Sequence, residues 1–115
     1  MEDINCFMAQ LLNGFKDLAS HNIVHRDFKP GNVLVSNGVL KIADFGQSKP
    51  LFYKSQIMNE FVGTLCTSAP QIKFNLDYTG KCDIYSLGIV YYWMIYNKYP
   101  YKDMISIEEY TNTKV

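Results

Sequence analysis

The feature that most constrains the fold of this chain is an Asn37-Gly38 pair between two short apolar runs. Val33-Leu34-Val35 precedes the pair, and Val39-Leu40-Lys41-Ile42 follows it. Asn and Gly both tolerate the positive φ angles of a tight two-residue turn, so the pattern predicts a β-hairpin. Two polar tripeptides flank it, His25-Arg26-Asp27 before and Asp44-Phe45-Gly46 after. Their placement around a hairpin makes the two tripeptides more informative together than either is alone.

Helical periodicity comes first along the chain, before the hairpin. Apolar residues recur at intervals of three and four from Ile4 to Ala19, which predicts an amphipathic helix over about residues 3–20. From residue 46 to about residue 80 the periodicity disappears, and small polar residues recur. A stretch of this length without regular structure is usually a functional loop.

A second helix is predicted from about residue 81 to residue 96, with Thr79 as its N-cap. Most of its circumference is apolar, and such a helix is normally surrounded by protein. Its longest uncharged run, residues 84–96, falls short of the roughly 20 residues that a bilayer-spanning helix needs, so we expect a core helix and no membrane association. Residues 101–115 show only a weak helical pattern.

The composition predicts one small folded unit without a strong electric field. The chain has 115 residues, of which 48% are hydrophobic, and 11 basic residues balance 11 acidic ones. This balance argues against nucleic acid as a partner. The three cysteines, Cys6, Cys66 and Cys82, are odd in number and form no Cys-x-x-Cys pair. We therefore expect no disulfide framework or zinc site, and a reducing, cytoplasmic location.

Residues around the hairpin have the chemistry that phosphoryl transfer needs. Asp27 is a carboxylate that would accept the proton of an attacking hydroxyl, and Lys29 is a cation that would lie near the transferring phosphate. Asn32 and Asp44 offer hard oxygen ligands of the kind that Mg²⁺ takes while it bridges nucleotide phosphates. Leu34, on the first predicted strand, would form an apolar floor under adenine.

Each motif also has an ordinary structural interpretation. An isolated His-Arg-Asp is more often a surface turn than a site, and Asp44-Phe45-Gly46 alone could be a strand that ends in a turn. Asn32 alone could belong to an Asx-turn. The hairpin between the two tripeptides shifts the balance toward a functional site.

The order of elements over residues 25–46, which is loop, strand, Asn-Gly turn, strand and Asp-Phe-Gly, resembles the catalytic segment of the eukaryotic protein kinases. Further along, Gly63-Thr64 and Ala69-Pro70-Gln71 resemble the end of a kinase activation segment. Residues 81–88 resemble the start of the long central helix of the kinase C-lobe. These matches cover about residues 3–103, nearly the whole chain.

The resemblance implies an α+β fold, namely the mainly α-helical C-lobe of a protein kinase with a small catalytic hairpin. Residues 1–115 would form a partial catalytic domain, from the first C-lobe helix through the central helix. It also implies ATP and Mg²⁺ as cofactors and a protein as substrate. A lysine two residues after the aspartate, as Lys29 is after Asp27, resembles the pattern of the serine/threonine class. In that class the counterpart of Thr64 hydrogen-bonds the residues that match Asp27 and Lys29.

The roles implied by the resemblance fall on few residues. Asp27, Lys29 and Thr64 would be catalytic, whereas Lys29, Asn32, Leu34 and Asp44 would bind the nucleotide, with Asn32 and Asp44 as the metal ligands. Structural roles are implied for three further residues. His25 and Phe45 would stack into the apolar spine that joins the lobes, and Asp83 would bind the backbone around His25 and Arg26 as a buried anchor. For His25 we favour this packing role over acid/base catalysis.

The sequence departs from the family pattern because it contains no Gly-x-Gly-x-x-Gly loop and no strand lysine in a Val-Ala-Ile-Lys setting. We therefore expect the N-lobe and the later C-lobe helices to be absent, and the isolated chain to have negligible kinase activity. An apolar surface should be exposed where an N-lobe or a partner chain would pack. The alternative function is a non-catalytic, kinase-derived module that binds or regulates a partner.

A second departure is Glu60, three residues before Gly63, where many kinases carry a phosphorylated threonine. Arg26 and Lys49 match the cations that receive that phosphate. One hypothesis is that the Glu60 carboxylate partly replaces the phosphate by contacting Arg26 or Lys49. The other is that Glu60 is a surface acid without a special role.

Overall fold

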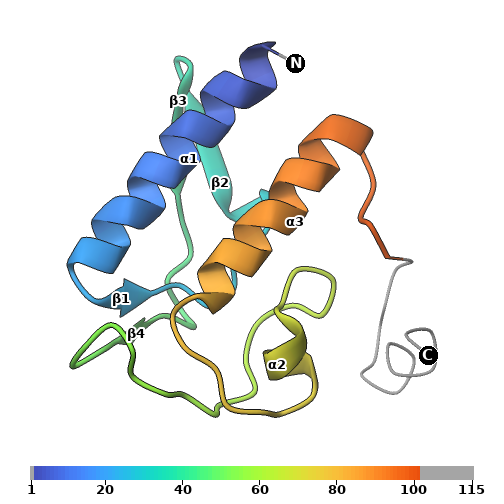
Figure 1. Cartoon of the computed structure of the whole chain (residues 1–115). Coiled ribbons are helices and arrows are strands. Elements are labelled where there is room, and N and C mark those ends of the chain that lie inside the picture. Colours follow the sequence, from blue (N-terminus) through green and yellow to red (C-terminus); the bar gives the residue numbers. More distant parts are fainter. Residues whose placement is uncertain (1, 102–115) are drawn as a thin grey trace.

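The computed structural model describes residues 2–101 of the chain. The elements are, in order, α1 (Glu2–Ser20), β1 (Ile23–Val24), a 3₁₀ turn (Pro30–Asn32), β2 (Val33–Ser36), β3 (Val39–Ile42), β4 (Lys49–Pro50), α2 (Pro70–Lys73) and α3 (Cys82–Tyr96). Helices α1 and α3 lie side by side, the β2–β3 hairpin lies against α1, and the short β1–β4 pair lies at the C-terminal end of α1 (Figure 1). The mixture of helices and small antiparallel sheets is compatible with the expected α+β class.

Helix α1 confirms the first predicted helix, and its apolar face forms one wall of a core. Leu11 and Phe15 of this helix are buried together with residues of the hairpin region and of α3, namely Phe28, Leu87 and Val90. The helix approaches β3 closely at Gly14, where an added Cβ would lie 2.9 Å from Cδ1 of Ile42. The small residue at this position therefore allows the close contact between α1 and the hairpin.

The hairpin is confirmed with the predicted turn. Val33 pairs with Ile42 at its open end and Ser36 pairs with Val39 next to the turn. Asn37 and Gly38 have φ angles of 53° and 77°, the positive values that a tight two-residue turn requires. The side chain of Gln10 on α1 holds the hairpin in place, because it donates to the Gly38 carbonyl (3.0 Å) and accepts from the Leu40 N–H (2.8 Å).

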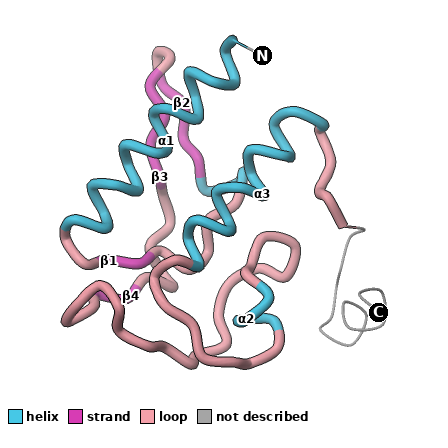
Figure 2. The backbone as a smooth tube through the Cα atoms, viewed as in Figure 1, coloured by secondary structure: helices cyan, strands magenta, loops and turns pink. Residues whose placement is uncertain are grey.

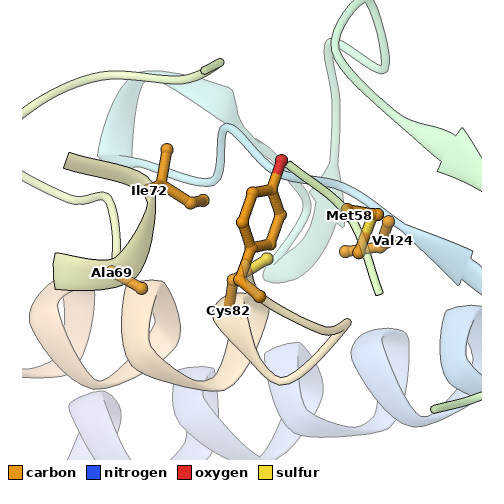
Figure 3. Close-up of a cluster of buried hydrophobic side chains, with 6 residues drawn as sticks. Val24, Met58, Ala69, Ile72 and Cys82 are labelled. Carbon is orange, nitrogen blue, oxygen red and sulfur yellow. The ribbon is translucent and has the colours of Figure 1, made fainter. Parts of the chain in front are cut away.

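The segment between residues 46 and 80 is mostly irregular, as predicted, with β4 and the short helix α2 as its regular parts (Figure 2). It is held by a two-way backbone bridge, in which the Met58 N–H donates to the Tyr78 carbonyl (2.7 Å) and the Tyr78 N–H donates to the Met58 carbonyl (2.9 Å). A second core lies beneath this segment (Figure 3), and its buried members are Val24, Met58, Ala69, Ile72, Tyr78 and Cys82.

The predicted N-cap of the second helix is wrong. Helix α3 begins at Cys82, and the N-cap position is Lys81, which has helical backbone angles and makes no side-chain capping bond. The chain makes a tight turn before the helix, in which the Thr79 carbonyl accepts the Cys82 N–H (3.1 Å). The Thr79 hydroxyl accepts the Lys81 N–H within this turn (3.4 Å), which is one residue before the helix begins, so Thr79 does not occupy the N-cap position.

Within the part of the chain that the structure describes, protein surrounds this helix only in part. Leu87, Ile89 and Val90 are buried, but the Ile84 side chain is 61% exposed and that of Tyr96 is 58% exposed. Apolar side chains near both ends of α3 are therefore exposed within residues 2–101, in line with the expected exposed apolar surface. The weak helical pattern of residues 102–115 lies outside the described residues, and no described helix is long and apolar enough to cross a membrane.

Candidate active site

The base of the hairpin brings three of the predicted site residues together. Asn32 ends the 3₁₀ turn before β2, and its backbone carbonyl accepts the N–H of Ala43, the residue after β3 (2.8 Å). Asp44 follows Ala43 directly and is exposed. The Asn32 side chain points back to the preceding loop, where its Nδ2 donates to the backbone carbonyl of Asp27 (2.6 Å). The hairpin thus links the two polar tripeptides that flank it in the sequence.

A chain of hydrogen bonds joins the catalytic candidates Asp27, Thr64 and Lys29. The Thr64 hydroxyl donates to Oδ1 of Asp27 (2.8 Å), and Lys29 Nζ donates to the Thr64 hydroxyl (3.2 Å). Both predicted contacts of Thr64 are confirmed. The bridge fixes the orientation of the Asp27 carboxylate, and none of the hydrogen bonds found among residues 2–101 occupies its other oxygen, Oδ2.

His25 is a fully buried packing residue, as expected. Its Nε2 lies 2.8 Å from the Ala43 carbonyl, and its Nδ1 accepts the backbone N–H of Asp27 (3.1 Å). Both bonds are satisfied by the tautomer with its proton on Nε2. The predicted contact with Phe45 is confirmed, with ring centroids 5.0 Å apart. Because both ring nitrogens bind backbone groups beside the hairpin, His25 supports the site by its position.

Asp83 is the buried anchor that the resemblance implied. From the first turn of α3, its two carboxylate oxygens accept the backbone N–H groups of His25 (2.8 Å) and Arg26 (2.9 Å). Burial raises the pKa of the Asp83 carboxyl above its ordinary value, while these two N–H donors oppose the rise. The long helix therefore fixes the loop that carries Asp27.

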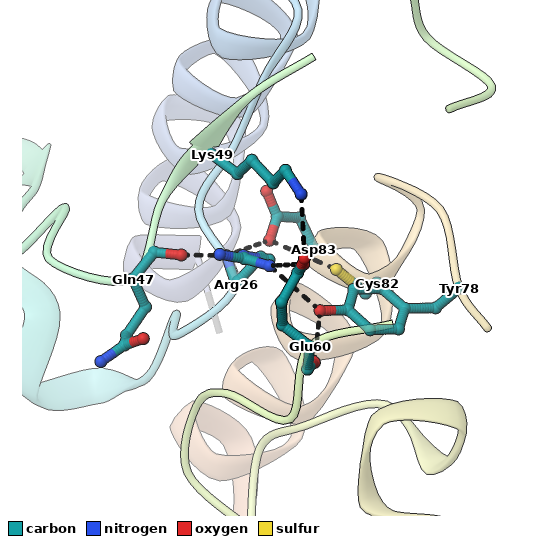
Figure 4. Close-up of polar contacts among 7 residues, drawn as sticks. All are labelled: Arg26, Gln47, Lys49, Glu60, Tyr78, Cys82 and Asp83. Carbon is teal, nitrogen blue, oxygen red and sulfur yellow. Dashed lines mark hydrogen bonds and ion pairs between the residues drawn. The ribbon is translucent and has the colours of Figure 1, made fainter. Parts of the chain in front are cut away.

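Arg26 lies at the centre of a polar cluster beside this loop (Figure 4). Its Nε donates to the Gln47 carbonyl (2.8 Å), and its Nη1 donates to the Glu60 carboxylate (2.7 Å) and to the Tyr78 hydroxyl (3.2 Å). Lys49 Nζ reaches the second oxygen of Glu60 (2.9 Å). The predicted contact of Glu60 is therefore confirmed for both cations. The hydrogen bond from Lys49 lowers the pKa of the Glu60 carboxyl below its ordinary value, and the hydrogen bond from Arg26 lowers it further.

Sequence reasoning missed Tyr78 as a member of this cluster. Its hydroxyl donates to the backbone carbonyl of Glu60 (2.7 Å), and burial raises the pKa of this hydroxyl. No local pattern marks Tyr78, which stands in an irregular segment 52 residues from Arg26 in sequence. Its role depends on the backbone bridge with Met58, a tertiary contact.

Gly63 allows the long loop to approach the site. Its φ angle is +97°, and an added Cβ would lie only 2.6 Å from the carbonyl oxygen of Arg26. A side chain at this position would clash with the backbone that precedes Asp27. The glycine thus lets Thr64, the next residue, reach the Asp27 carboxylate.

Leu34 and Asp44 are exposed, whereas Asn32, the other candidate metal ligand, is only 5% exposed. The Leu34 side chain on β2 is 59% exposed. Asn32 uses its amide nitrogen as a donor to Asp27, which leaves the amide oxygen as the group suited to a cation. Together with the exposed Asp44 carboxylate, this donor set suits Mg²⁺, which takes few protein oxygens when it also binds phosphates.

Comparison with known proteins decides the family. The family model described as the protein kinase domain matches residues 1–114 of this chain. The chain belongs to the protein kinase domain family. Mitogen-activated protein kinase 3 of Arabidopsis thaliana is 39% identical over 108 residues, which cover 90% of this chain and 29% of the relative.

Two further relatives extend the comparison of this kinase-domain chain. Mitogen-activated protein kinase kinase kinase 13 of Homo sapiens is 41% identical over 97 residues, or 84% of this chain and 10% of the relative. Serine/threonine-protein kinase atg1 of Dictyostelium discoideum is 42% identical over 93 residues, or 77% of this chain and 14% of the relative. The chain spans less than a third of the length of each relative that it matches here.

Proposed function

We propose that this kinase-domain chain is the catalytic segment of a protein serine/threonine kinase, which transfers the γ-phosphoryl group of ATP to a protein hydroxyl. The observation that carries the proposal is the bridge from Asp27 through Thr64 to Lys29. It fixes a carboxylate and a cation on neighbouring positions, as proton acceptance and phosphate stabilisation require.

Asp27 is the proposed base. With Oδ1 held by Thr64, Oδ2 would accept the proton of the substrate hydroxyl as its oxygen bonds to the γ-phosphorus and the bond to ADP breaks. Lys29 would offset the negative charge on the transferring group. The anchoring of the preceding backbone by Asp83 keeps the base in place before the substrate arrives.

Asn32 and Asp44 are the proposed Mg²⁺ ligands, and Leu34 is the proposed apolar contact for adenine. Bound Mg²⁺ would neutralise charge on the nucleotide phosphates. The protein holds Asn32 by its bond to the Asp27 carbonyl, so the proposed metal ligand and the proposed base are mechanically linked. A shift of one side chain would therefore disturb the other.

The serine/threonine class and the assignment to a C-lobe segment, residues 1–115 from its first helix through the central helix, belong to the same proposal. Lys29 and its contact with Thr64 favour that class, and one relative carries serine/threonine-protein kinase in its name. The sequence contains neither the Gly-rich loop nor the strand lysine that hold ATP phosphates in this family. We therefore expect negligible phosphate transfer by the 115-residue chain alone. A cytoplasmic location stays a prediction from the cysteine spacing.

Titration with Mg²⁺ and ATP tests the proposal directly. NMR chemical shifts of the Asn32 and Leu34 amides should move in a saturable way with Mg²⁺–ATP and much less with ATP in EDTA. Asp44→Asn should abolish the Mg²⁺-dependent part, whereas Asp77→Asn, which makes the same charge change at another exposed residue, should leave it unchanged. Equal responses of the two variants would contradict the assignment of the metal ligands.

One observation favours the alternative, a non-catalytic module that binds a partner. An apolar cavity of about 350 Å³ lies between α1, the hairpin and α3, and its lining includes Phe7, Val35 and Trp93. A partner chain or an N-lobe could pack against this surface. Tight binding of a partner by an Asp27→Asn variant, together with no response of the parent chain to Mg²⁺–ATP, would favour this alternative over the kinase.

A further inference from the structure

The Glu60 carboxylate joins three separate segments of the chain. One oxygen accepts from Arg26 in the loop after β1 (2.7 Å), and the other accepts from Lys49 on β4 (2.9 Å). Glu60 itself belongs to the irregular segment that leads to Gly63 and Thr64. A single anion between two cations from different segments holds those segments at a fixed spacing (Figure 4).

The guanidinium of Arg26 is paired with an anion at this position. Arg26 is only 8% exposed and has a positive φ angle of 73°, which residues other than glycine rarely adopt. Its other guanidinium contacts are the Gln47 carbonyl and the Tyr78 hydroxyl, which are both uncharged. A buried guanidinium without a counter-charge is costly. The Asp83 carboxylate binds the Arg26 backbone N–H, and Glu60 is the carboxylate that contacts the guanidinium itself.

The position of Glu60 is set by the backbone on its N-terminal side. Two residues earlier, Met58 exchanges backbone hydrogen bonds with Tyr78 in both directions. The Tyr78 hydroxyl then donates to the Glu60 carbonyl (2.7 Å) while it accepts from Arg26. The carboxylate is therefore presented to both cations by an ordered backbone, although its side chain is 43% exposed.

We propose that Glu60 is a positioning residue, whose permanent carboxylate orders residues 47–64 and orients Arg26 beside Asp27 without phosphorylation of this loop. A phosphate placed opposite Arg can order a loop by adding charge-assisted hydrogen bonds. Here one side chain already supplies an oxygen to each of two cations. The inference rests on the proposed function, since the loop that becomes ordered carries the proposed base.

Amide hydrogen exchange of the unphosphorylated chain, verified by its intact mass, provides the test. The Met58 amide is the reporter, because it donates to Tyr78 within two residues of Glu60. In Glu60→Gln, Met58 exchange should accelerate by about tenfold, the factor that corresponds to about 1.4 kcal/mol. Glu60→Asp keeps the charge and should recover part of the protection. The matched charge control Asp77→Asn should stay within about twofold of the parent.

The pH dependence of Met58 protection distinguishes a role of the Glu60 charge from a role of Glu60 in packing. Arg26 and Lys49 face Glu60 as cations and Tyr78 faces it as a hydroxyl, and the cations lower its pKa from the ordinary 4.5. The stabilisation is therefore complete above the ordinary pKa and is lost as pH falls through the lowered one. Corrected for intrinsic rates, Met58 protection should show this acid loss in the parent chain, and Glu60→Gln should lack that step.

Two results would overturn the inference. One is Met58 exchange in Glu60→Gln that matches the parent, and the other is an equal acceleration in Asp77→Asn. The Mg²⁺–ATP titration on the same samples distinguishes this failure from failure of the proposed function. Nucleotide binding without a Glu60 effect overturns the positioning role alone. A Glu60 effect in a chain that does not respond to Mg²⁺–ATP overturns the kinase proposal alone.

Discussion

Replacement of Asp83 by alanine is the sharpest structural perturbation that the site offers. Asp83 accepts the backbone N–H groups of His25 and Arg26, and it is the contact through which α3 holds the loop before Asp27. Asp83→Ala would leave both N–H groups buried without an acceptor. The variant should therefore destabilise the fold and loosen this loop more than it disturbs the hairpin.

The magnitude follows from the two lost hydrogen bonds. Each buried donor left unsatisfied costs about 1–3 kcal/mol, so the pair costs about 2–6 kcal/mol. Burial of the carboxylate is itself unfavourable, as its raised pKa indicates, and alanine removes that cost. We therefore expect a loss of about 3 kcal/mol in the free energy of unfolding, out of the roughly 5–15 kcal/mol that stabilises a typical domain.

Urea unfolding followed by fluorescence of the single tryptophan, Trp93, measures this loss. Asp83→Asn keeps one acceptor oxygen and should lose about half as much, which preserves the test if the alanine variant does not fold. Asp77→Ala removes an exposed carboxylate and should change stability by less than about 0.5 kcal/mol. A loss below about 1 kcal/mol in Asp83→Ala, with an unchanged urea dependence, would refute the anchoring role.

Three further predictions concern the loop, the bridge and the thiols. Gly63→Ala should destabilise the chain by about 2 kcal/mol or more in the same urea assay, because the added Cβ would clash with the Arg26 carbonyl. Gly31→Ala should not destabilise the chain, because a Cβ at residue 31 meets open space. Equal effects of the two variants would contradict the close approach at Gly63. Thr64→Val should lower the free energy of unfolding in urea by about 1 kcal/mol, because the Thr64 hydroxyl bridges Asp27 and Lys29. Thr64→Ser keeps a hydroxyl and should lower it much less. Similar losses in the two variants would contradict the bridge. Burial raises the pKa of the Cys82 thiol to about 12. At pH 8 a thiol reagent should therefore label the exposed Cys6 quickly and Cys82 only after unfolding. Fast labelling of both cysteines in the native chain would contradict the burial of Cys82.

Much of the local structure could be predicted because it depends on short-range pattern. The spacing of apolar residues determines α1, and the need for two positive φ angles at Asn37 and Gly38 determines the hairpin. The Thr79 cap was wrong because a tight turn before the helix moved its start, and such turns depend on the surrounding packing. The exposed apolar side chains of α3 agree with the expected apolar surface, but apolar composition alone does not show which of them lack neighbours.

The contacts within the site could be predicted only where the family resemblance implied them. Spacing alone does not bring Thr64 to Asp27, which is 37 residues away in sequence, and the geometry confirms the contact that the resemblance implied. The contacts of Gln10 with the hairpin and of Tyr78 with Arg26 lacked a sequence signal. Both are single polar side chains placed by tertiary structure, and an isolated Gln or Tyr carries no pattern that identifies its partner.

In the proposed function, the base of this hairpin binds metal and nucleotide for phosphoryl transfer. NMR relaxation with Mn²⁺–ATP in place of Mg²⁺–ATP tests it most directly, because the paramagnetic ion broadens only nearby signals, even when binding is weak. Mn²⁺–ATP should selectively broaden the amide signals of Asn32, Leu34 and Asp44, and Asp44→Asn should abolish this broadening. Broadening that is absent, spread evenly over the surface or unchanged in Asp44→Asn would contradict a metal–nucleotide site at the base of the hairpin.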